Sequence, residues 1–223
     1  MKTTEKISEF TIYRLSVYRR CLEQLERENI KTISSKDFAL RFGLNSAQVR
    51  KDLAYFGEFG IRGMGYPVTT LKEQILNILG LAECATGKKT WKTAIIGAGK
   101  LGTTLLQYKD FRKRGFEIVA IFDRDMESPE YKRQQQAERI ETSVPLFSVD
   151  QLENVIREQE IDIIILAIPE DEAQAITDWV VQAGVHAILN FVPVQLLVPP
   201  EVKVRTVDMV AELQSLTYHL NRG

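Results

Sequence analysis

The sequence predicts two domains, an all-α domain over about the first 80 residues and an α/β domain over the rest. Up to about residue 80 the apolar side chains recur every three or four residues, which is the spacing of amphipathic helices. From Trp91 onward short apolar runs alternate with helical segments, as in a parallel sheet covered by helices. The small, polar stretch at residues 83–89 separates the two patterns and is the expected linker.

The composition is that of an ordinary folded protein. Of the 223 residues, 44% are hydrophobic and 26% are charged, which excludes a disordered or fibrous chain. No apolar run reaches the roughly 18 residues of a membrane span, and the first residues lack the apolar segment of a signal peptide. Two cysteines, Cys21 and Cys84, are too few for a disulfide framework and have no metal-ligand spacing. We therefore expect a soluble, cytoplasmic protein without a metal site.

The net charge of −1 divides unevenly along the chain. Residues 1–80 contain 13 Lys and Arg against 9 Asp and Glu, a balance of +4, and the remainder carries −5. A basic N-terminal part is one indication of contact with nucleic acid.

The first two predicted helices differ in length. The first has one apolar stripe, which consists of Ile12, Leu15, Tyr18, Leu22 and Leu25. The second begins after Ser34, which can form a capping box with Asp37, and it ends after two turns at Gly43.

A third helix begins after Asn45, a good N-cap with Gln48 three residues on, and is expected to run to Gly57. Two short helices joined through a glycine turn are typical of a helix-turn-helix. The inward face is expected to hold Val49, Leu53 and Phe56. The outward face is expected to hold Ser46, Ala47, Arg50, Lys51 and Ala54. Small residues beside two cations suit a helix that enters a major groove of about 12 Å.

A glycine-rich segment follows this third helix. Residues 57–66 contain four glycines, which favour tight turns and positive φ angles, as in a short β-hairpin with Arg62 near its tip. A hairpin carrying arginine beside a recognition helix predicts a winged helix, whose wing follows the DNA backbone or minor groove. A helical bundle with a surface hairpin is the alternative.

The α/β domain opens with a dinucleotide-binding fingerprint. Residues 91–96 form a strand, residues 97–102 read GAGKLG, and a helix with Leu101, Leu105 and Phe111 among its apolar positions follows. A second strand, residues 116–123, ends in an acid. A GxGxxG motif between a strand and a helix, with an acid about 20 residues on, is the context in which this motif binds NAD(H).

Each residue of the fingerprint has an expected role. Gly97 makes the tight turn, Gly99 lets the backbone approach the pyrophosphate, and Gly102 lets the helix pack on the strand. The helix N-terminus supplies N–H groups for the phosphates. Asp123 would accept hydrogen bonds from the ribose hydroxyls and repel a 2′-phosphate, which favours NAD(H) over NADP(H), and Arg124 beside it weakens that preference slightly.

The remaining segments complete a parallel, doubly wound sheet. Further strands are expected at residues 162–168, 187–191 and 202–207, with helices at 149–158, where Ser148 and Gln151 form the cap, and at 171–183. The last helix, residues 209–220, has an apolar stripe of Val210, Leu213, Leu216 and Leu220. A terminal amphipathic helix of this kind often docks on a partner.

The side chains of a dehydrogenase are missing. Such an enzyme needs a proton donor or acceptor beside the nicotinamide. Neither His186 nor His219 lies in the sequence context of a general base, and there is no nucleophile elbow. We expect a sensor and not an enzyme. Two alternatives remain. One is an NAD-dependent oxidoreductase, and the other is a CoA-binding or nucleotide-binding module of a ligase-like enzyme. The acid at Asp123 argues against the second alternative.

Four segments together resemble the Rex family of redox-sensing transcriptional repressors. They are QVRKDLAYFG at residues 48–57, RGMGY at 62–66, GAGKLG at 97–102 and ILNFVPV at 188–194. The resemblance extends from about residue 12 to residue 220. It implies a winged-helix DNA-binding domain (residues 1–82), a Rossmann-type NAD(H)-binding domain (83–207) and a C-terminal helix exchanged between protomers (208–223). It also implies a homodimer that binds double-stranded, palindromic operator DNA and is released by NADH, with NAD competing.

The resemblance assigns roles to individual positions. Contacts to DNA are expected from Ser46, Gln48, Arg50, Lys51, Tyr55, Arg62, Gly63 and Gly65. Contacts to the cofactor are expected from Gly97, Ala98, Gly99, Lys100, Leu101, Gly102, Tyr108, Asp123 and Asp208. A switch is expected in which Tyr108, on the helix after the glycine loop, meets Asp208 when NADH is bound, and Arg20 pairs with Asp208 in the DNA-competent state.

Other interpretations of these positions stay open. Arg50 and Lys51 either read bases or only contact phosphates. Arg20 is either a switch residue or a solvated helix residue, and Asp208 is either its partner or merely an N-cap. Met209 stands where some members of the family have a phenylalanine near the nicotinamide.

Overall fold

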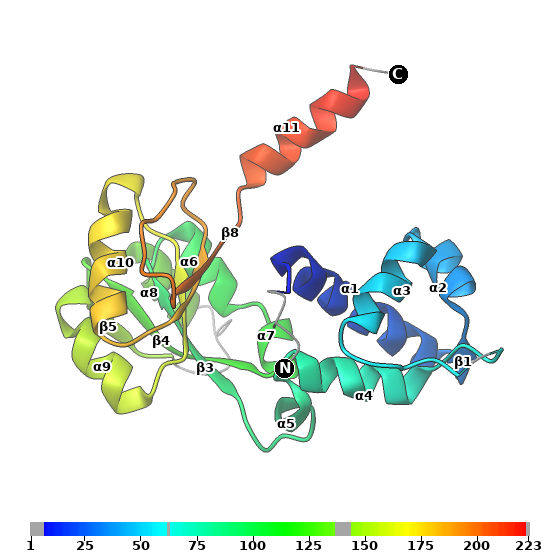
Figure 1. Cartoon of the computed structure of the whole chain (residues 1–223). Helices are drawn as coiled ribbons and strands as arrows, with labels where there is room; N and C mark the ends of the chain where they lie inside the picture. Colours follow the sequence, from blue (N-terminus) through cyan, green and yellow to red (C-terminus); the bar gives the residue numbers. More distant parts are fainter. Residues whose placement is uncertain (1–6, 62, 137–143, 222–223) are drawn as a thin grey trace. The chain divides into compact units, whose positions relative to one another are not determined.

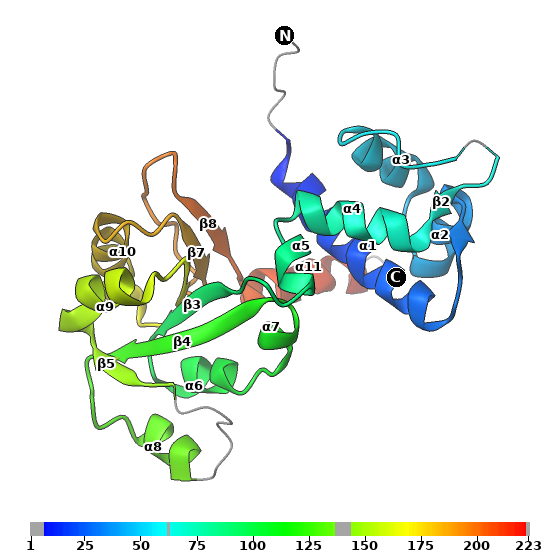
Figure 2. The same ribbon diagram turned by 90° about the horizontal axis from the view of Figure 1, so that it is seen from below.

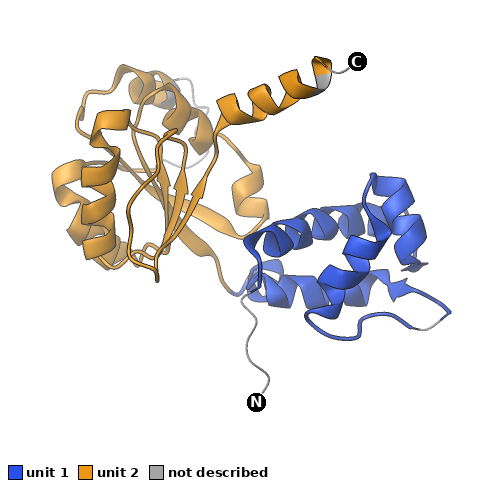
Figure 3. Ribbon diagram, turned by 45° about the horizontal axis from the view of Figure 1, so that its top comes forward, with its two compact units in different colours: residues 1–88 blue, residues 89–223 orange. Residues whose placement is uncertain are grey.

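The structure, a computed structural model, describes residues 7–61, 63–136 and 144–221. It divides into two compact units, residues 1–88 and residues 89–223 (Figure 3). The first unit includes a short helix, α5 (Ala82–Ala85), that crosses the predicted domain boundary after residue 82 and extends into the stretch expected to be a linker. The functional boundaries after residues 82 and 207 stay predictions.

The first unit has the element order of a winged helix (Figure 1). Before α5 its elements are α1 (Glu9–Arg27), β1 (Thr32–Ile33), α2 (Ser35–Phe42), α3 (Ser46–Ala54), β2 (Tyr66–Pro67) and α4 (Val68–Ile78). Strand β1 pairs antiparallel with β2, so the chain between α3 and α4 returns to the strand that precedes α2.

One hydrophobic core joins α1, α2, α3 and α4. Leu15, Tyr18, Leu22 and Leu25 of α1 are buried, as predicted, and they pack with Val49 and Leu53 of α3 and with Val68, Leu71 and Ile75 at α4. Ile12, predicted to belong to the stripe, is 36% exposed. Thr11 is buried instead, because it lies one full turn before Leu15 on the line that faces the core.

Caps define the ends of α2 and α3. The Ser34 hydroxyl accepts a hydrogen bond from the Asp37 N–H and donates to the Asp37 carboxylate, so the predicted capping box forms in part. Gly43 ends α2 in the left-handed conformation. Helix α3 ends at Ala54 and not at Gly57 as expected, because the Phe56 N–H turns back to the Leu53 carbonyl.

The second unit is a six-stranded, fully parallel sheet in the order β5-β4-β3-β6-β7-β8. The strands are β3 (Trp91–Ile96), β4 (Phe116–Asp123), β5 (Leu146–Ser148), β6 (Ile163–Leu166), β7 (Ala187–Asn190) and β8 (Lys203–Thr206). The helices are α6 (Lys100–Leu106), α7 (Asp110–Lys113), α8 (Pro129–Gln136), α9 (Leu152–Gln159), α10 (Ala173–Gln182) and α11 (Met209–Leu220), with 3-10 turns η1 (Val149–Gln151) and η2 (Glu170–Glu172). This is the Rossmann order, in which the strand order reverses at β3 and β6.

Helices cover both faces of the sheet (Figure 2). Ala94 and Ile96 pack in the cluster that contains residues of α9 and α10. Ile95, between them, packs in a second cluster with residues of α6, α7 and α8. This alternation of successive β3 side chains follows from the two-residue period of a strand.

The predicted elements of this unit are largely confirmed. The predicted bounds of β3, β4 and α11 match those of the structure, and Ser148 and Gln151 form the expected capping box. Strand β5 and helix α8 were not predicted. The helix expected after the glycine loop is two helices, because the Gln107 and Tyr108 N–H groups bond to Thr104 and Leu105 and turn the chain between α6 and α7.

The apolar stripe of α11 faces solvent in this chain. Val210, Leu213, Leu216 and Leu220 are between 59% and 79% exposed. None of the helices within the described ranges is long and apolar enough to cross a membrane.

Candidate DNA-reading surface and dinucleotide site

Helix α3 presents a polar face and buries an apolar one. The Asn45 side chain accepts hydrogen bonds from the Ala47 and Gln48 N–H groups at 2.9 and 3.0 Å, which confirms it as the N-cap. Val49 and Leu53 are 1% and 2% exposed. The opposite side, called here the reading face, consists of Ser46, Ala47, Gln48, Arg50, Lys51 and Ala54. Ser46 and Gln48 are half-buried, and the other four side chains are exposed.

The two cations of the reading face differ in their contacts. Arg50 donates from Nη1 to the Ser35 hydroxyl of α2 at 3.0 Å, which links the two helices of the helix-turn-helix. Lys51 is exposed beside it. Tyr55, the residue after α3, is 44% exposed and continues the same surface.

The predicted wing is a tight turn closed by an antiparallel bridge between Ile61 and Gly65. Gly63 and Gly65 have φ angles of 82° and 89°, which favour glycine. A Cβ on Gly65 would also lie 2.4 Å from the Ile33 carbonyl oxygen, so this glycine lets the turn close against β1. Arg62, predicted at the tip, lies outside the described residues.

A buried acid, Asp52, anchors α3, and this role was not predicted from the sequence. Asp52 is 1% exposed. Arg14 of α1 donates from Nε to Oδ2 at 2.6 Å and from Nη2 to Oδ1 at 2.7 Å. The Tyr18 hydroxyl donates to Oδ2 at 2.8 Å, and Gln48 Nε2 donates to Oδ1 at 2.7 Å. We call Arg14, Tyr18, Gln48 and Asp52 the Asp52 cluster.

The cluster keeps its carboxylate charged. Burial alone would raise the pKa of Asp52, but the hydrogen bonds from Arg14, Tyr18 and Gln48 outweigh it, so this pKa lies below its usual value. Burial, and then the bond to Asp52, raises the pKa of the Tyr18 hydroxyl. The signal in the sequence was the spacing, because Asp52 falls on the same helix face as Val49 and Phe56, where an acid needs a buried partner.

The glycine loop lies between β3 and α6, at the point where the strand order reverses. Gly97 has a φ of 108°, and a Cβ there would lie 2.2 Å from the Ala167 carbonyl oxygen. A Cβ on Gly102 would lie 1.8 Å from the Gly97 carbonyl oxygen. A Cβ on Gly99 would meet no atom within 4 Å. Two glycines are therefore required by packing, while Gly99 borders open space in which a ligand would fit.

The rest of the loop and Asp123 come together around this space. Ala98 is buried, its N–H donates to Asp123 Oδ2 at 2.5 Å, and Asp123 Oδ1 accepts from the Asp125 N–H at 2.9 Å. Lys100 and Leu101 form the first turn of α6. The backbone cradle and the carboxylate at the end of β4 fit the phosphates and ribose of a dinucleotide.

Arg124 is held by an acid from beyond β6. Its Nη1 donates to Glu172 Oε1 of η2 at 2.6 Å. Its side chain is 62% exposed, so the pair contributes little to stability. The pair does give the guanidinium of Arg124, the residue after Asp123, a defined partner in Glu172.

The predicted switch residues lie on separate elements. Tyr108 was expected on the helix after the glycine loop, but it lies in the turn between α6 and α7. Its side chain is 56% exposed, and its ring packs edge-on against Phe111. Asp208 caps α11, since its Oδ1 accepts from the Val210 and Ala211 N–H groups, both at 2.9 Å. Arg20 is exposed on α1 in the first unit. The pairing of these three stays a prediction.

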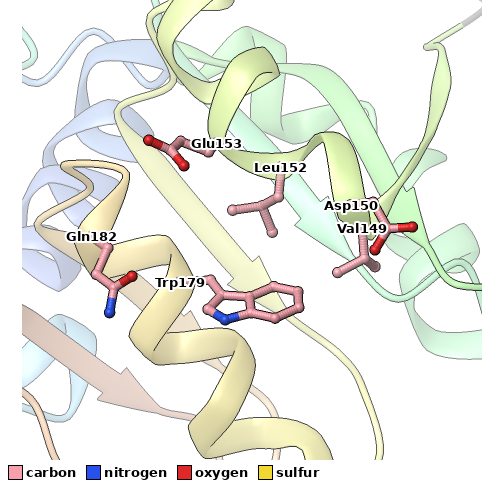
Figure 4. Close-up of a pocket in the computed structure, with 6 residues that line it drawn as sticks. All are labelled: Val149, Asp150, Leu152, Glu153, Trp179 and Gln182. Atoms are coloured by element: carbon pink, nitrogen blue, oxygen red, sulfur yellow. The ribbon is translucent and has the colours of Figure 1, made fainter.

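The second unit also has a cavity that lies apart from the glycine loop. This cavity of about 290 Å³ is lined by residues of η1, of the start of α9 and of α10, and the Leu152 side chain points toward Trp179 in it (Figure 4). It shares no lining residue with the glycine loop. His186 is exposed. Within residues 7–61, 63–136 and 144–221, no group of His, Cys, Asp and Glu is arranged to hold a metal ion.

Two family models match this chain. Residues 6–54 match a family described as "Putative DNA-binding protein N-terminus". Residues 88–194 match a family described as "CoA binding domain". The two matches fall on the two units in turn.

Relatives match over nearly the full length. The redox-sensing transcriptional repressor Rex of Carboxydothermus hydrogenoformans is 46% identical, covering 97% of this chain and 98% of the relative. That of Desulfitobacterium hafniense is 47% identical, covering 99% and 98%. Among solved structures, RSP in complex with β-NAD⁺ and operator DNA has a TM-score of 0.83 and 37% identity, covering 98% of this chain and 94% of that one.

RSP has also been solved in complex with β-NADH, at a TM-score of 0.80 and 37% identity. The full-length relatives are named repressors and not enzymes. With identity above 40% across both units, this chain belongs to the Rex family of redox-sensing transcriptional repressors.

Proposed function

We propose that this protein is a DNA-binding transcriptional repressor that senses the ratio of NADH to NAD. One observation carries the proposal. A relative that matches the whole chain has been solved with NAD⁺ and operator DNA and, separately, with NADH, and this chain has a surface suited to each ligand. The cytoplasm is the location that this function requires.

In the proposed function α3 enters the major groove. Arg50 and Lys51 stand exposed on the reading face, and arginine can bind guanine O6 and N7 with two hydrogen bonds. Ser46, Gln48 and Tyr55 flank them, and Gly63 and Gly65 bring the wing, with Arg62, to the adjacent groove. To contact a base, the Arg50 guanidinium would have to break its hydrogen bond to Ser35 or keep that bond while its other nitrogen atoms contact the base.

The second unit binds NADH, with NAD as the competitor. When bound, the dinucleotide supplies the preference for one conformation that a switch requires. The backbone of residues 97–102 holds the phosphates and Asp123 accepts the ribose hydroxyls. An oxidoreductase of this fold would need a proton relay, and a CoA-binding module would not need Asp123, so turnover assays and titration with CoA separate these alternatives.

The switch joins the two units through a homodimer. The exposed apolar stripe of α11 is covered by the partner protomer in the exchanged arrangement that the family resemblance implies. Arg20 pairs with Asp208 in the DNA-competent state, and Tyr108 approaches Asp208 when NADH is bound. Asp208 already caps α11 through Oδ1, so the alternative role as an N-cap is compatible with a second role.

A double-mutant cycle on Arg20 and Asp208 tests the switch. Operator affinity is measured with and without NADH for Arg20→Ala, Asp208→Asn and the double variant. We expect the effects on NADH-induced release to be non-additive. Additive effects with release intact would exclude this pair as the switch.

The function itself is tested by selecting DNA from a random duplex library with the full-length protein. We expect the selected sequences to be palindromic, and NADH to weaken binding to them more than NAD does. Recovery of unrelated sequences, or the same affinity with and without NADH, would overturn the proposed function.

A further inference from the structure

Asp52 lies on the buried side of α3, but one of its contacts reaches the reading face. We propose that Asp52 is a positioning residue for DNA reading: it turns the Gln48 amide so that the oxygen faces outward, where it accepts a hydrogen bond from a base amino group. This inference rests on the proposed function, because it takes α3 as the helix that reads the operator.

The Asp52 carboxylate is fully engaged. Each of its two oxygens accepts two hydrogen bonds, three from Arg14 and Tyr18 of α1 and one from Gln48. At 1% exposure, water has no access to replace any of these donors. The carboxylate is therefore a fixed point to which the Gln48 side chain, one helical turn earlier, is tied.

The chemistry of this contact determines which way the amide faces. An ionised carboxylate only accepts hydrogen bonds, so it pairs with the amide nitrogen of Gln48 and repels the amide oxygen. Oε1 is consequently turned away from Asp52. Because the O and N atoms of an amide have nearly the same shape, a glutamine amide fits equally well after a flip of about 180°. The Asp52 carboxylate favours one of these two orientations.

The position of Gln48 suits base contact. It lies in the first turn of α3, and the N-terminal residues of a recognition helix are those that contact base edges. Its neighbours Ser46 and Ala47 are small, which lets the helix approach the groove. An outward acceptor matches the amino group at N6 of adenine or N4 of cytosine in the major groove.

The test is a base-pair scan of the selected operator. Every base pair of one half-site is changed in turn, and the affinity of each duplex is measured for the wild type, Gln48→Ala, Arg50→Ala and Asp52→Asn. The position that Gln48 reads is the one at which Gln48→Ala loses the preference of the wild type. We expect that preference to be about fivefold or more, the lower end for a specific base contact.

Asp52→Asn should lose the preference at that same position and keep the preference at the position lost in Arg50→Ala. Tyr18→Phe is the matched control, because it removes one donor from the same carboxylate but leaves the Gln48 contact on the other oxygen. It should keep the preference at the Gln48 position. Retention of that preference in Asp52→Asn, or an equal fall at every position, would overturn the inference.

If the Asp52 variant does not fold, a second measurement on the wild-type protein tests the inference. In the wild-type protein the Gln48 side-chain NH₂ should be protected from hydrogen exchange, both free and bound to operator. Loss of that protection on binding operator would overturn the inference. Absence of sequence-specific binding by the wild type would instead overturn the proposed function, so the two failures are distinguishable.

Discussion

The glycine loop of the second unit and α3 of the first unit hold their shapes in different ways. The loop is shaped by backbone, because Gly97 and Gly102 stand where a Cβ would lie 2.2 and 1.8 Å from a carbonyl oxygen. Helix α3 is held by side chains, through the Asp52 cluster and the Arg50–Ser35 contact. A backbone site depends on which residues are glycine, whereas a side-chain site depends on partners that are distant in the chain.

The largest expected effect separates the glycines of the loop. Gly102→Ala places a methyl group on the Gly97 carbonyl oxygen and should destabilise the second unit by more than about 3 kcal/mol, beyond ordinary overpacking. Gly99→Ala is the control, since a Cβ there meets no atom within 4 Å. It should leave the melting temperature unchanged and lower the affinity for NADH. Equal stability of the two variants would contradict the role given to Gly102.

The next effect concerns the Asp52 cluster. Arg14→Met leaves a buried carboxylate without its cation and should destabilise the first unit by about 3 kcal/mol, the lower end for a broken buried pair, because Arg14 itself is partly exposed. Denaturant unfolding measures this. A change below about 0.5 kcal/mol, typical of a surface substitution, would contradict the account.

Acid titration provides the control for Arg14→Met. The folded-state pKa of Asp52 is lowered, so its stabilising contribution is present above the ordinary carboxyl pKa of about 3.9 and is lost as pH falls through the lowered value. The stability difference between wild type and Arg14→Met should therefore be full at pH 6 and shrink below about pH 4. A difference that does not change with pH would show that lost packing, not the charge, is responsible.

A smaller effect is expected for Asp123 at the dinucleotide site. Asp123→Ala removes the ribose acceptor and the group that repels a 2′-phosphate, so NADH affinity should fall by roughly tenfold or more, as for a lost charged hydrogen bond. The gap between NADH and NADPH should narrow, while operator binding without cofactor should survive. Calorimetric titration measures both affinities. A wild type that binds NADPH as tightly as NADH would remove the basis of this role.

The smallest effect concerns the partner of Arg124. Glu172→Gln removes the charged partner of Arg124, the residue after Asp123. The released guanidinium should raise NADPH affinity by up to about fivefold, the scale of an exposed ion pair. NADH affinity should stay the same. Glu170→Gln, in the same short turn, is the control and should change neither affinity. A rise for both variants would indicate a general charge effect.

The same contrast explains what the sequence could predict. The places of the GAGKLG loop between β3 and α6 and of Asp123 at the end of β4 were predicted correctly, because glycine and long apolar runs have few other interpretations. The binding roles of these residues stay predictions. Strand β5 was missed because three residues make no recognisable run. The turn at Tyr108 was missed because hydrogen bonds to Thr104 and Leu105, not a glycine or proline, end α6.

In the first unit the outward face of α3 followed from helical periodicity, but its anchor did not. Arg14 and Asp52 are 38 residues apart in the chain, and only the fold brings them together. Gln48 was predicted to contact DNA without any indication that a buried acid sets its orientation. The spacing of residues along the chain predicts which face of a helix a side chain lies on. The side chains that it contacts in the fold determine which of its atoms face outward.

The central claim, that the dinucleotide controls the DNA-reading surface, is tested most directly by operator affinity at saturating NADH and in its absence. Typical coupling between two sites predicts that NADH weakens operator binding by roughly 5–150-fold, with NAD producing a much smaller change. Unchanged operator affinity, measured while the protein demonstrably binds NADH, would contradict the account.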